Sequence, residues 1–236
     1  MEGTRANVAA VVVAGGSSRR MGFDKLRAVL GGSPVYLHCL RTLQECREIR
    51  QIILVASGEN FAEFRTATVG FPKLTDVIAG GAERHFSVAA GLERVAPDCE
   101  FVAVHDAARP LLSARDLHSV LAAAREHGAA SLASPVADTL KQADAENFVS
   151  AGVDRRQLWS MQTPQVFRVE RLRAAYAALL ARDELVTDEV SAVAKQGDRV
   201  KLVPAQDFNF KITYSCDIAL ARLALLPRDE ASREAS

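Results

Sequence analysis

The feature that most constrains the fold of this chain is a set of unbroken apolar runs. Val8–Ala14 reads VAAVVVA, Gln51–Ala56 reads QIILVA, and Phe101–His105 reads FVAVH. A strand with one face in water alternates apolar and polar residues, so a run without alternation predicts a strand that is covered on both faces. Strands of this kind occur in parallel sheets that carry helices on either side.

Segments with helical features separate the predicted strands. Ser33-Pro34 has the form of an N-cap followed by proline at the first helical position, which predicts a helix to about Glu48. Ser113 is the predicted cap of a helix that runs to about Glu126. The repeated strand–helix order predicts an α/β fold with a doubly wound, mostly parallel sheet. Further helices are expected at 60–67, 83–95, 170–182, 188–195 and 218–226, and further strands at 74–78, 129–136 and 199–204.

The segment 138–160 breaks this pattern. It reads DTLKQADAENFVSAGVDRRQLWS, which is polar with scattered apolar residues and has no helical face. Irregular chain of this length inside a domain is typical of a functional loop or arm, and we expect a β-hairpin that reaches toward a partner subunit. A plain surface loop is the alternative. The 236 residues fit a single domain over 1–226 that includes this arm, and we expect the charged tail at 227–236 to be disordered.

The composition argues against several kinds of partner. Lys plus Arg number 29 and Asp plus Glu number 29, so the net charge is zero, whereas a dedicated nucleic-acid binder normally carries a basic excess. No apolar run reaches the roughly 18–20 residues of a membrane helix, and we expect no secretory signal. The four cysteines are widely spaced, so buried thiols are expected rather than a zinc site or disulfides. We therefore expect a cytoplasmic protein that binds neither nucleic acid nor membrane.

A glycine-rich loop follows the first predicted strand, at the edge where open α/β sheets bind ligands. It reads GGSSRRMG from Gly15 to Gly22, and glycines there let backbone N–H groups approach phosphate oxygens. It is neither a Walker A loop nor a GxGxxG fingerprint. Its distinguishing content is cationic, because Arg19, Arg20 and Lys25 could stabilise the charge that builds when a triphosphate loses pyrophosphate. A turn with solvated arginines is the alternative.

A second candidate site follows the strand at 101–105. Asp106 lies where this strand is expected to meet solvent, a position suited to a carboxylate that binds Mg²⁺ together with substrate phosphates; a helix cap is the alternative. Arg109 could hold a second anionic group. His105 is better explained as a structural imidazole than as a general base, because a phosphate nucleophile is already ionised at neutral pH.

A second glycine-rich turn opens the helix expected at 83–95. Gly80 and Gly81, with Ser87 nearby, could cradle a base or ribose through backbone groups and a hydroxyl. Glycines before a helix are also common in ordinary loops, so this turn alone identifies no ligand.

In register, these motifs resemble those of the 2-C-methyl-D-erythritol 4-phosphate cytidylyltransferase family of the non-mevalonate isoprenoid pathway. The resemblance runs from about Val8 to Leu223 and is carried by VAGGSSRRMGFDK, GGAERHFSVAAGL, VHDAARP, PVADTLK, VDRRQLW, QTPQVF, VTDEVSAV and NFKIT. That family joins CTP to methylerythritol phosphate with Mg²⁺ and releases pyrophosphate. Its fold is a Rossmann-like nucleotidyltransferase fold, and it dimerises through an extended arm, which the segment 138–160 would form here.

The resemblance implies roles for the matching residues. The nucleotide would be bound by Ala14, Gly15, Gly16, Gly80, Gly81 and Ser87. The catalytic cations would be Arg20, Lys25, Lys211 and Arg155, with Lys211 bridging the substrate phosphate and the α-phosphate of CTP. The polyol phosphate would be bound by Asp106, Arg109, Thr139, Arg155 and Thr163, the arm residues coming from the partner subunit of a homodimer. Asp106 would bind Mg²⁺ or the substrate's hydroxyls.

Other activities stay open as alternatives. The short first loop, from Ala14-Gly15-Gly16 to Lys25, looks like that of the guanylyltransferases of molybdenum-cofactor synthesis. Ribitol-5-phosphate cytidylyltransferase shares the fold and much of the pattern. A nucleotide-binding protein that has lost its chemistry is disfavoured, because a pure binder has no need of the retained cations. The sequence favours an enzyme that transfers CMP from CTP to 2-C-methyl-D-erythritol 4-phosphate.

Overall fold

The apolar runs of the sequence form the centre of a sheet. The structure, a computed structural model, describes residues 7–15, 22–58, 60–182 and 184–225. In it, β1 (Val8–Ala14) pairs in parallel with β4 (Ile49–Ala56) on one side and with β6 (Phe101–Asp106) on the other. Almost every residue of these three strands is buried. The absence of alternation in the sequence therefore has the predicted cause, which is burial on both faces.

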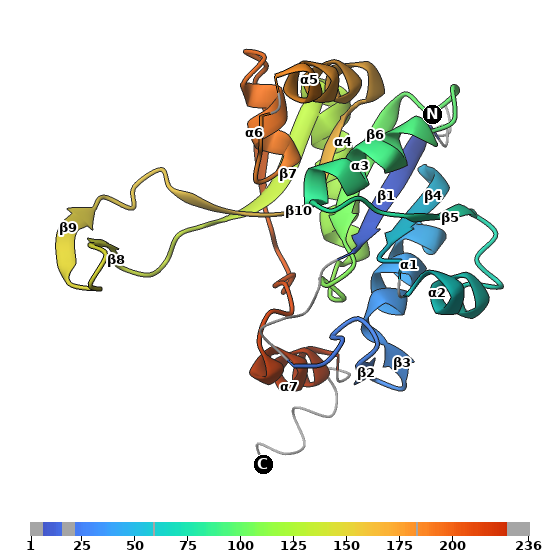
Figure 1. Ribbon diagram of the computed structural model, residues 1–236, viewed down its shortest axis with the longest axis horizontal. Helices are drawn as coiled ribbons and strands as arrows, with labels where there is room; N and C mark the ends of the chain where they lie inside the picture. The colour runs from blue at the N-terminus through green and yellow to red at the C-terminus, as the bar shows by residue number, and fades with distance from the viewer. Residues whose placement is uncertain (1–6, 16–21, 59, 183, 226–236) are drawn as a thin grey trace.

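Four more strands extend this centre into a seven-stranded sheet (Figure 1). All the neighbouring strands are parallel except at β10, which runs antiparallel to both β6 and β7. The predicted mostly parallel sheet is confirmed. The order across the sheet is β11 (Lys201–Pro204), β7 (Ala129–Pro135), β10 (Trp159–Arg168), β6, β1, β4 and β5 (Leu74–Ala79).

Helices cover both faces of the sheet (Figure 1). Alternate residues of β1 point into two separate cores, which confirms the doubly wound arrangement. Ala10 and Val12 pack with residues of α1 (Val35–Glu45) and α4 (Ala114–His127), whereas Ala9 and Val11 pack with residues of α3 (Arg84–Glu93) and α5 (Val169–Ala181). The other helices of the described residues are α2 (Phe61–Ala67), α6 (Glu189–Ala194) and α7 (Ser215–Ala224).

The start of α1 differs from the prediction. Ser33 was expected to cap this helix, but Ser33–Pro34 forms the short strand β3, which pairs antiparallel with β2 (Val29–Leu30). The helix begins only at Val35, and its N-cap makes no side-chain hydrogen bond. The Ser33 hydroxyl instead accepts a hydrogen bond from Arg41 at 2.8 Å. The predicted cap at Ser113 is confirmed, because its Oγ accepts from the backbone N–H of Asp116 at 3.1 Å.

The strand β10 was not predicted. Its first half carries polar residues and Pro164, and the pairing with β7 shifts register between Met161 and Gln165. These features hide the usual strand pattern. The peptide bond between Thr163 and Pro164 is cis. β10 lies directly beside β6 and brings Thr163 to the end of that strand.

The segment 138–160 contains the predicted hairpin. β8 (Leu140–Ala143) and β9 (Val149–Val153) pair antiparallel and project from the body of the molecule (Figure 1). At its turn, the Asp144 carboxylate accepts hydrogen bonds from the backbone N–H groups of Glu146 and Phe148. The surface-loop alternative is therefore wrong.

The structure also shows where the cysteines lie and what kinds of helix the chain forms. Cys39, Cys46 and Cys99 are buried as predicted, but Cys216 is exposed on α7. Among the helices of the described residues, none combines the length and the apolar character that crossing a membrane requires.

Candidate active site

The candidate site lies at the carboxyl ends of the central strands. Asp106 is the last residue of β6, and Ala14 is the last residue of β1 beside it. The backbone N–H of Ala107 donates to the carbonyl of Val13 at 3.0 Å, which joins the two strand ends. Because parallel strands end at one edge of a sheet, residues that are far apart in the sequence meet here.

Three cationic side chains surround the Asp106 carboxylate. Lys211 Nζ donates to Oδ2 at 2.9 Å, and Nε and Nη2 of Arg84 both lie 3.2 Å from Oδ1. Arg109 Nε lies 3.7 Å from Oδ2. Burial by itself would favour the neutral acid, but the charges of Arg84, Lys211 and Arg109 outweigh it and hold the pKa of Asp106 well below its usual range. The carboxylate is therefore ionised. The helix-cap alternative for Asp106 is wrong, because Asp106 ends β6 and the next helix, α4, is capped by Ser113.

A second carboxylate fixes Arg84 in place. Glu189, at the start of α6, is fully buried and binds Arg84 through both oxygens, at 2.6 and 3.0 Å. The hydroxyl of Tyr176 donates to the same carboxylate at 2.9 Å. Burial would lower the pKa of Arg84, but Glu189 and Asp106 raise it above its usual value. Arg84 thus bridges two carboxylates, and this cluster of two anions and three cations keeps one net positive charge for an anionic ligand.

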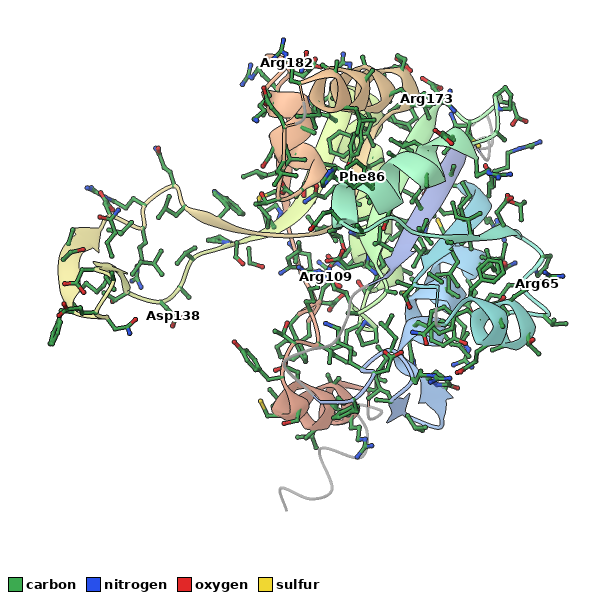
Figure 2. The ribbon with its side chains drawn as sticks, viewed as in Figure 1. Arg65, Phe86, Arg109, Asp138, Arg173 and Arg182 are labelled. Atoms are coloured by element: carbon green, nitrogen blue, oxygen red, sulfur yellow. The ribbon has the colours of Figure 1, made fainter. Side chains whose placement is uncertain are left out.

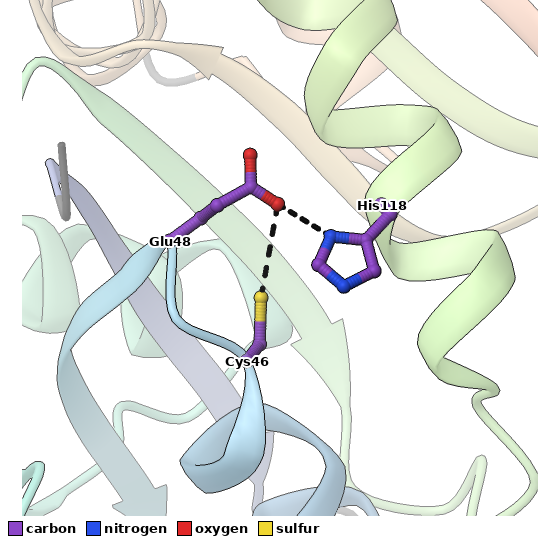
Figure 3. Close-up of side chains that lie close together, drawn as sticks. All are labelled: Cys46, Glu48 and His118. Atoms are coloured by element: carbon purple, nitrogen blue, oxygen red, sulfur yellow. Dashed lines mark hydrogen bonds and ion pairs between the residues drawn. The ribbon is translucent and has the colours of Figure 1, made fainter. Parts of the chain in front are cut away.

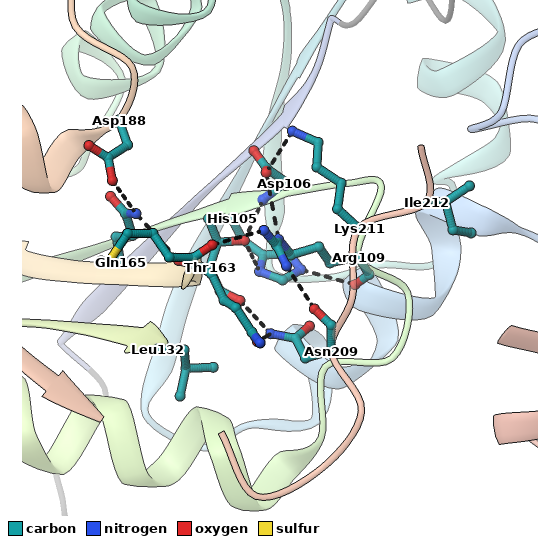
Figure 4. A network of polar contacts seen from close by, with 12 residues as sticks. His105, Asp106, Arg109, Leu132, Thr163, Gln165, Asp188, Asn209, Lys211 and Ile212 are labelled. Carbon is teal, nitrogen blue, oxygen red and sulfur yellow. Dashed lines mark hydrogen bonds and ion pairs between the residues drawn. The ribbon is translucent and has the colours of Figure 1, made fainter. Parts of the chain in front are cut away.

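A buried polar network supports the loop after β6 (Figure 4). The backbone N–H of Asp106 donates to Thr163 Oγ1 at 3.0 Å, and that hydroxyl lies 3.1 Å from His105 Nδ1. The carbonyl of Arg109 lies 3.2 Å from His105 Nε2 and can only accept, so the neutral imidazole carries its proton on Nε2 and accepts at Nδ1 from the Thr163 hydroxyl. Burial is the main reason why the pKa of His105 falls to about 4. A neutral, fully bonded imidazole agrees with the predicted structural role.

Arg109 is held by the backbone on either side of the site. Its Nη1 donates to the carbonyl of Asn209 at 2.8 Å, and its Nη2 donates to the carbonyl of Met161 at 3.4 Å. The Asn209 amide in turn donates to the carbonyl of Thr163 at 2.8 Å. The loop that carries Lys211 is therefore fastened to β10 and to the loop after β6 (Figure 4).

Lys25 reaches the same loop from the N-terminal part of the chain. Its Nζ donates to the carbonyl of Ile212, the residue after Lys211, at 2.8 Å. The turn before it is fixed by Asp24, whose carboxylate accepts from the backbone N–H of Leu26 and from the side chain of Asn60. The structure thus brings together two predicted cations that are 186 positions apart in the sequence.

The glycine-rich turns lie close to each other around Ser87. A Cβ added to Gly80 would lie 2.5 Å from Ser87 Oγ, and one added to Gly15 would lie 3.8 Å from the same atom. A Cβ on Gly81 would lie 2.4 Å from Cβ of Phe86. Separations below 3 Å cannot be accommodated without movement, so Gly80 and Gly81 are required for this packing. Small residues from two loops therefore meet around one buried hydroxyl.

The remaining predicted residues are not part of this cluster. Thr139 and Arg155 are exposed on the arm beside the β8–β9 hairpin, where Arg155 Nη1 donates to the carbonyl of Ala137. Figure 2 shows Asp138 out on the arm, separate from Arg109 in the body of the molecule. Gly16, Arg19, Arg20 and the predicted tail lie outside the described residues.

The sequence did not predict roles for Arg84, Glu189 and Asn209. All three lie within motifs that were noted, GGAERHF, VTDEVSAV and NFKIT. Arg84 and Glu189 are 105 positions apart, and nothing in the sequence of either motif indicates that their side chains pair. The sequence shows only that Arg84 and Glu189 each lie at the start of a predicted helix, which does not indicate a role in a site.

Known proteins are similar to this chain in sequence and in fold. The sequence model of the family described as "IspD: 2-C-methyl-D-erythritol 4-phosphate cytidylyltransferase" matches residues 8–226. The chain belongs to this family. A member from Caldanaerobacter subterraneus subsp. tengcongensis is 39% identical, covering 93% of this chain and 99% of the relative. A member from Symbiobacterium thermophilum is 41% identical over 94% of each chain. Both are named 2-C-methyl-D-erythritol 4-phosphate cytidylyltransferase.

Solved structures of the family have a fold similar to that of this chain. The crystal structure of 4-diphosphocytidyl-2C-methyl-D-erythritol synthase from Anaerococcus prevotii is 28% identical, with a TM-score of 0.82 over 93% of this chain and 98% of that one. The crystal structure of the cytidylyltransferase from Thermus thermophilus is also 28% identical, with a TM-score of 0.76 over 90% of this chain and 96% of that one. The predicted Rossmann-like nucleotidyltransferase fold with an arm is the fold of this IspD family.

The buried, neutral His105 predicts a pH dependence of stability. Its pKa is about 4 in the folded chain against 6.5 for an ordinary histidine, so its contribution to stability is complete above pH 6.5 and is lost as the pH falls toward 4. The shift corresponds to about 3 kcal/mol. Urea unfolding gives the free energy of unfolding at pH 7 and at pH 4. The loss of this free energy between the two pH values should be smaller for His105→Gln than for the unchanged chain. If the free energy of unfolding of His105→Gln depends on pH as strongly as that of the unchanged chain, the assignment is contradicted.

Proposed function

We propose that this chain transfers the cytidylyl group of CTP to 2-C-methyl-D-erythritol 4-phosphate and releases pyrophosphate, a step of isoprenoid biosynthesis. The observation that carries the proposal is the meeting of Lys25, Lys211 and Asp106 at the carboxyl edge of the sheet, in a chain that belongs to the family. The identity of the two substrates rests on the names of the family members. The cluster supplies the charge that this reaction needs.

The reaction is an in-line displacement at phosphorus. An oxygen of the polyol phosphate forms a bond to the α-phosphorus of CTP, while the bond from that phosphorus to the bridging oxygen breaks and pyrophosphate leaves with the electron pair. The attacking phosphate is already ionised at neutral pH, so no general base is required. This agrees with a His105 that is buried, neutral and engaged in hydrogen bonds.

The main task of the protein is to bring two anions together. Lys211 is part-exposed, so its ammonium group can turn from Asp106 to bridge the polyol phosphate and the α-phosphate. Lys25, whose Nζ donates to the loop that carries Lys211, would neutralise the triphosphate together with Arg20. Arg109, whose guanidinium is fixed by two carbonyls, would hold the polyol phosphate. Fixed cations that meet developing charge supply most of the catalysis in phosphoryl transfer.

The two glycine-rich turns would hold the nucleotide. Ala14 and Gly15 present backbone groups at the end of β1, and Gly16, which follows them in the sequence, would join them. Gly80 and Gly81 pack against Ser87 and Phe86 in the other turn, and neither has a side chain that would block a ligand. Backbone N–H groups in such turns bind phosphate oxygens and base edges at close range.

Asp106 fits the requirements of a Mg²⁺ ligand. Mg²⁺ prefers oxygen ligands and is typically held by one or two carboxylates together with substrate phosphates. Asp106 provides an ionised carboxylate, and one of its partners, Lys211, is free to move to the substrate. When bound, Mg²⁺ would neutralise charge on the triphosphate and its leaving group. Asp106 would hold either the metal or the hydroxyls of the polyol.

The arm would complete the site of a second subunit. Phe148 and Val149 are neighbours beside its turn and are 67% and 68% exposed, so they offer two adjacent large apolar side chains to a partner. Thr139 and Arg155 lie on the arm and away from Lys211 of their own chain. A homodimer in which each arm reaches into the partner's site would bring these residues to the polyol phosphate, beside Thr163.

The cytoplasm is the compartment that we propose for this enzyme. The four cysteines carry free thiols, and Cys216 is exposed. Thiols stay reduced in the cytoplasm, whereas exposed thiols in secreted proteins tend to pair.

Pyrophosphate release tests the proposed activity. With CTP and Mg²⁺, we expect release with 2-C-methyl-D-erythritol 4-phosphate and little with ribitol 5-phosphate, or with GTP in place of CTP. Lys25→Ala and Lys211→Ala should each reduce turnover by about a hundredfold or more without unfolding the chain, since each removes a cation from the reacting phosphates. Lys195→Ala, an exposed lysine paired with Glu184, is the matched control. Release with ribitol 5-phosphate alone would overturn the substrate assignment.

A mixing experiment tests the shared site. Lys211→Ala disables the body of one subunit and Arg155→Ala disables its arm, so each variant alone should be nearly inactive. In a homodimer with exchanged arms, every mixed dimer has one intact site out of two. Co-expression of the two variants should therefore restore about a quarter of the unaltered activity, because half of randomly formed dimers are mixed. A co-expressed sample no more active than the separate variants would show that each arm serves its own chain.

A further inference from the structure

We propose that Cys46, Glu48 and His118 form a second cation site, for a thiophilic divalent cation of the Zn²⁺ class (Figure 3). Cys46 follows the last residue of α1, Glu48 precedes β4, and His118 comes from α4. The Sγ, carboxylate and imidazole donor atoms all lie within 4.8 Å of one another. Glu48 lies before the first residue of β4, so this site is at the opposite end of the strands from Asp106.

The donor set matches the chemistry of zinc. Zn²⁺ is bound by cysteine sulfur, histidine nitrogen and carboxylate oxygen at about 2.0–2.3 Å, which places tetrahedral ligand atoms about 3–4 Å apart. Glu48 Oε2 lies 2.6 Å from His118 Nδ1 and 4.0 Å from Cys46 Sγ. The first separation is shorter than this range and the second is at its upper end, so small side-chain shifts would make room for the ion. The His118 side chain is 55% exposed, which leaves a solvent-facing position for a water ligand.

The surroundings orient the carboxylate and set the strength of the site. Arg125 binds Oε1 of Glu48, which leaves Oε2 for the cation, and hydrogen-bonded carboxylates of this kind are usual around bound metals. Lys73 donates to the carbonyl of Cys46 at 2.7 Å. The positive charges of Arg125 and Lys73 oppose a dication, so we expect weaker binding than at closed structural zinc sites.

Binding requires the thiolate form of Cys46. Burial raises the pKa of this thiol, so without a metal it keeps its proton. On binding, the Sγ–H bond breaks, a bond from Sγ to the metal forms, and the proton leaves to solvent. The bound cation would tie the end of α1, the start of β4 and the middle of α4 together. These segments meet only in the folded chain, so binding would stabilise the fold.

Thermal unfolding of the metal-free full chain with Zn²⁺ as the probe tests this inference. Saturating Zn²⁺ should raise the melting temperature by about 5 °C. Cys46→Ser and His118→Gln should abolish most of this rise, because each removes one ligand. Cys216→Ser and His127→Gln are the matched controls, since they remove an exposed thiol and an exposed imidazole outside the cluster. Both controls should respond like the unchanged chain.

Co²⁺ absorption provides a second readout that involves neither stability nor activity. A thiolate-to-cobalt band should appear in the unchanged chain and in Cys216→Ser, and it should be absent from Cys46→Ser. No rise and no band in the unchanged chain would overturn the proposal, and the cluster would then be a simple ion-pair network. Loss of both signals in Cys216→Ser would also overturn it, because the metal would then bind the exposed thiol. If a variant in the cluster fails to fold, the Zn²⁺ and Co²⁺ signals of Cys216→Ser still show whether the metal binds the exposed thiol.

Discussion

The ion pairs of Asp106 are the interaction on which the rest of this site depends. A buried carboxylate is costly unless it is paired, and here its partners come from α3, from the loop after β6 and from the loop before α7. Pairing therefore draws three distant segments to the end of one strand. Loss of one partner would leave the buried charge of Asp106 poorly compensated. Substitution of any of these paired residues should therefore destabilise the site.

One of the three cations around Asp106 can move to another partner, whereas the other two are held in place. Arg84 is fixed by the buried Glu189, and Arg109 is fixed by backbone carbonyls, so neither is easily displaced. Lys211 is the more exposed of the three and has a flexible side chain. An arriving phosphate would therefore draw Lys211 away from Asp106 while the other two cations keep their places. This geometry contains the fixed part of the site and one movable cation.

Local sequence patterns predicted much of this fold because they have local causes. The central strands follow from unbroken apolar runs, and the arm follows from a polar stretch without a helical face. The position of Asp106 follows from its place after a buried strand. Pairings that depend on the complete fold could not be predicted, such as Arg84 with Glu189, or Cys46 with His118. β10 was missed because polar residues that serve the site replace its apolar pattern, and Ser33 was misassigned because its backbone joins a strand pair that no short-range signal indicates.

The state of the Asp106 carboxyl tests the account most directly. Carbon-13 NMR of the labelled chain, with the signal assigned by its absence from Asp106→Asn, would follow this carboxyl as the pH is lowered while the chain stays folded. Unpaired aspartates titrate near pH ~3.9. We predict that Asp106 stays ionised after the exposed aspartates have taken up their protons, because Arg84, Lys211 and Arg109 stabilise its charge. A carboxyl that titrates together with the exposed aspartates would contradict the central role of these ion pairs.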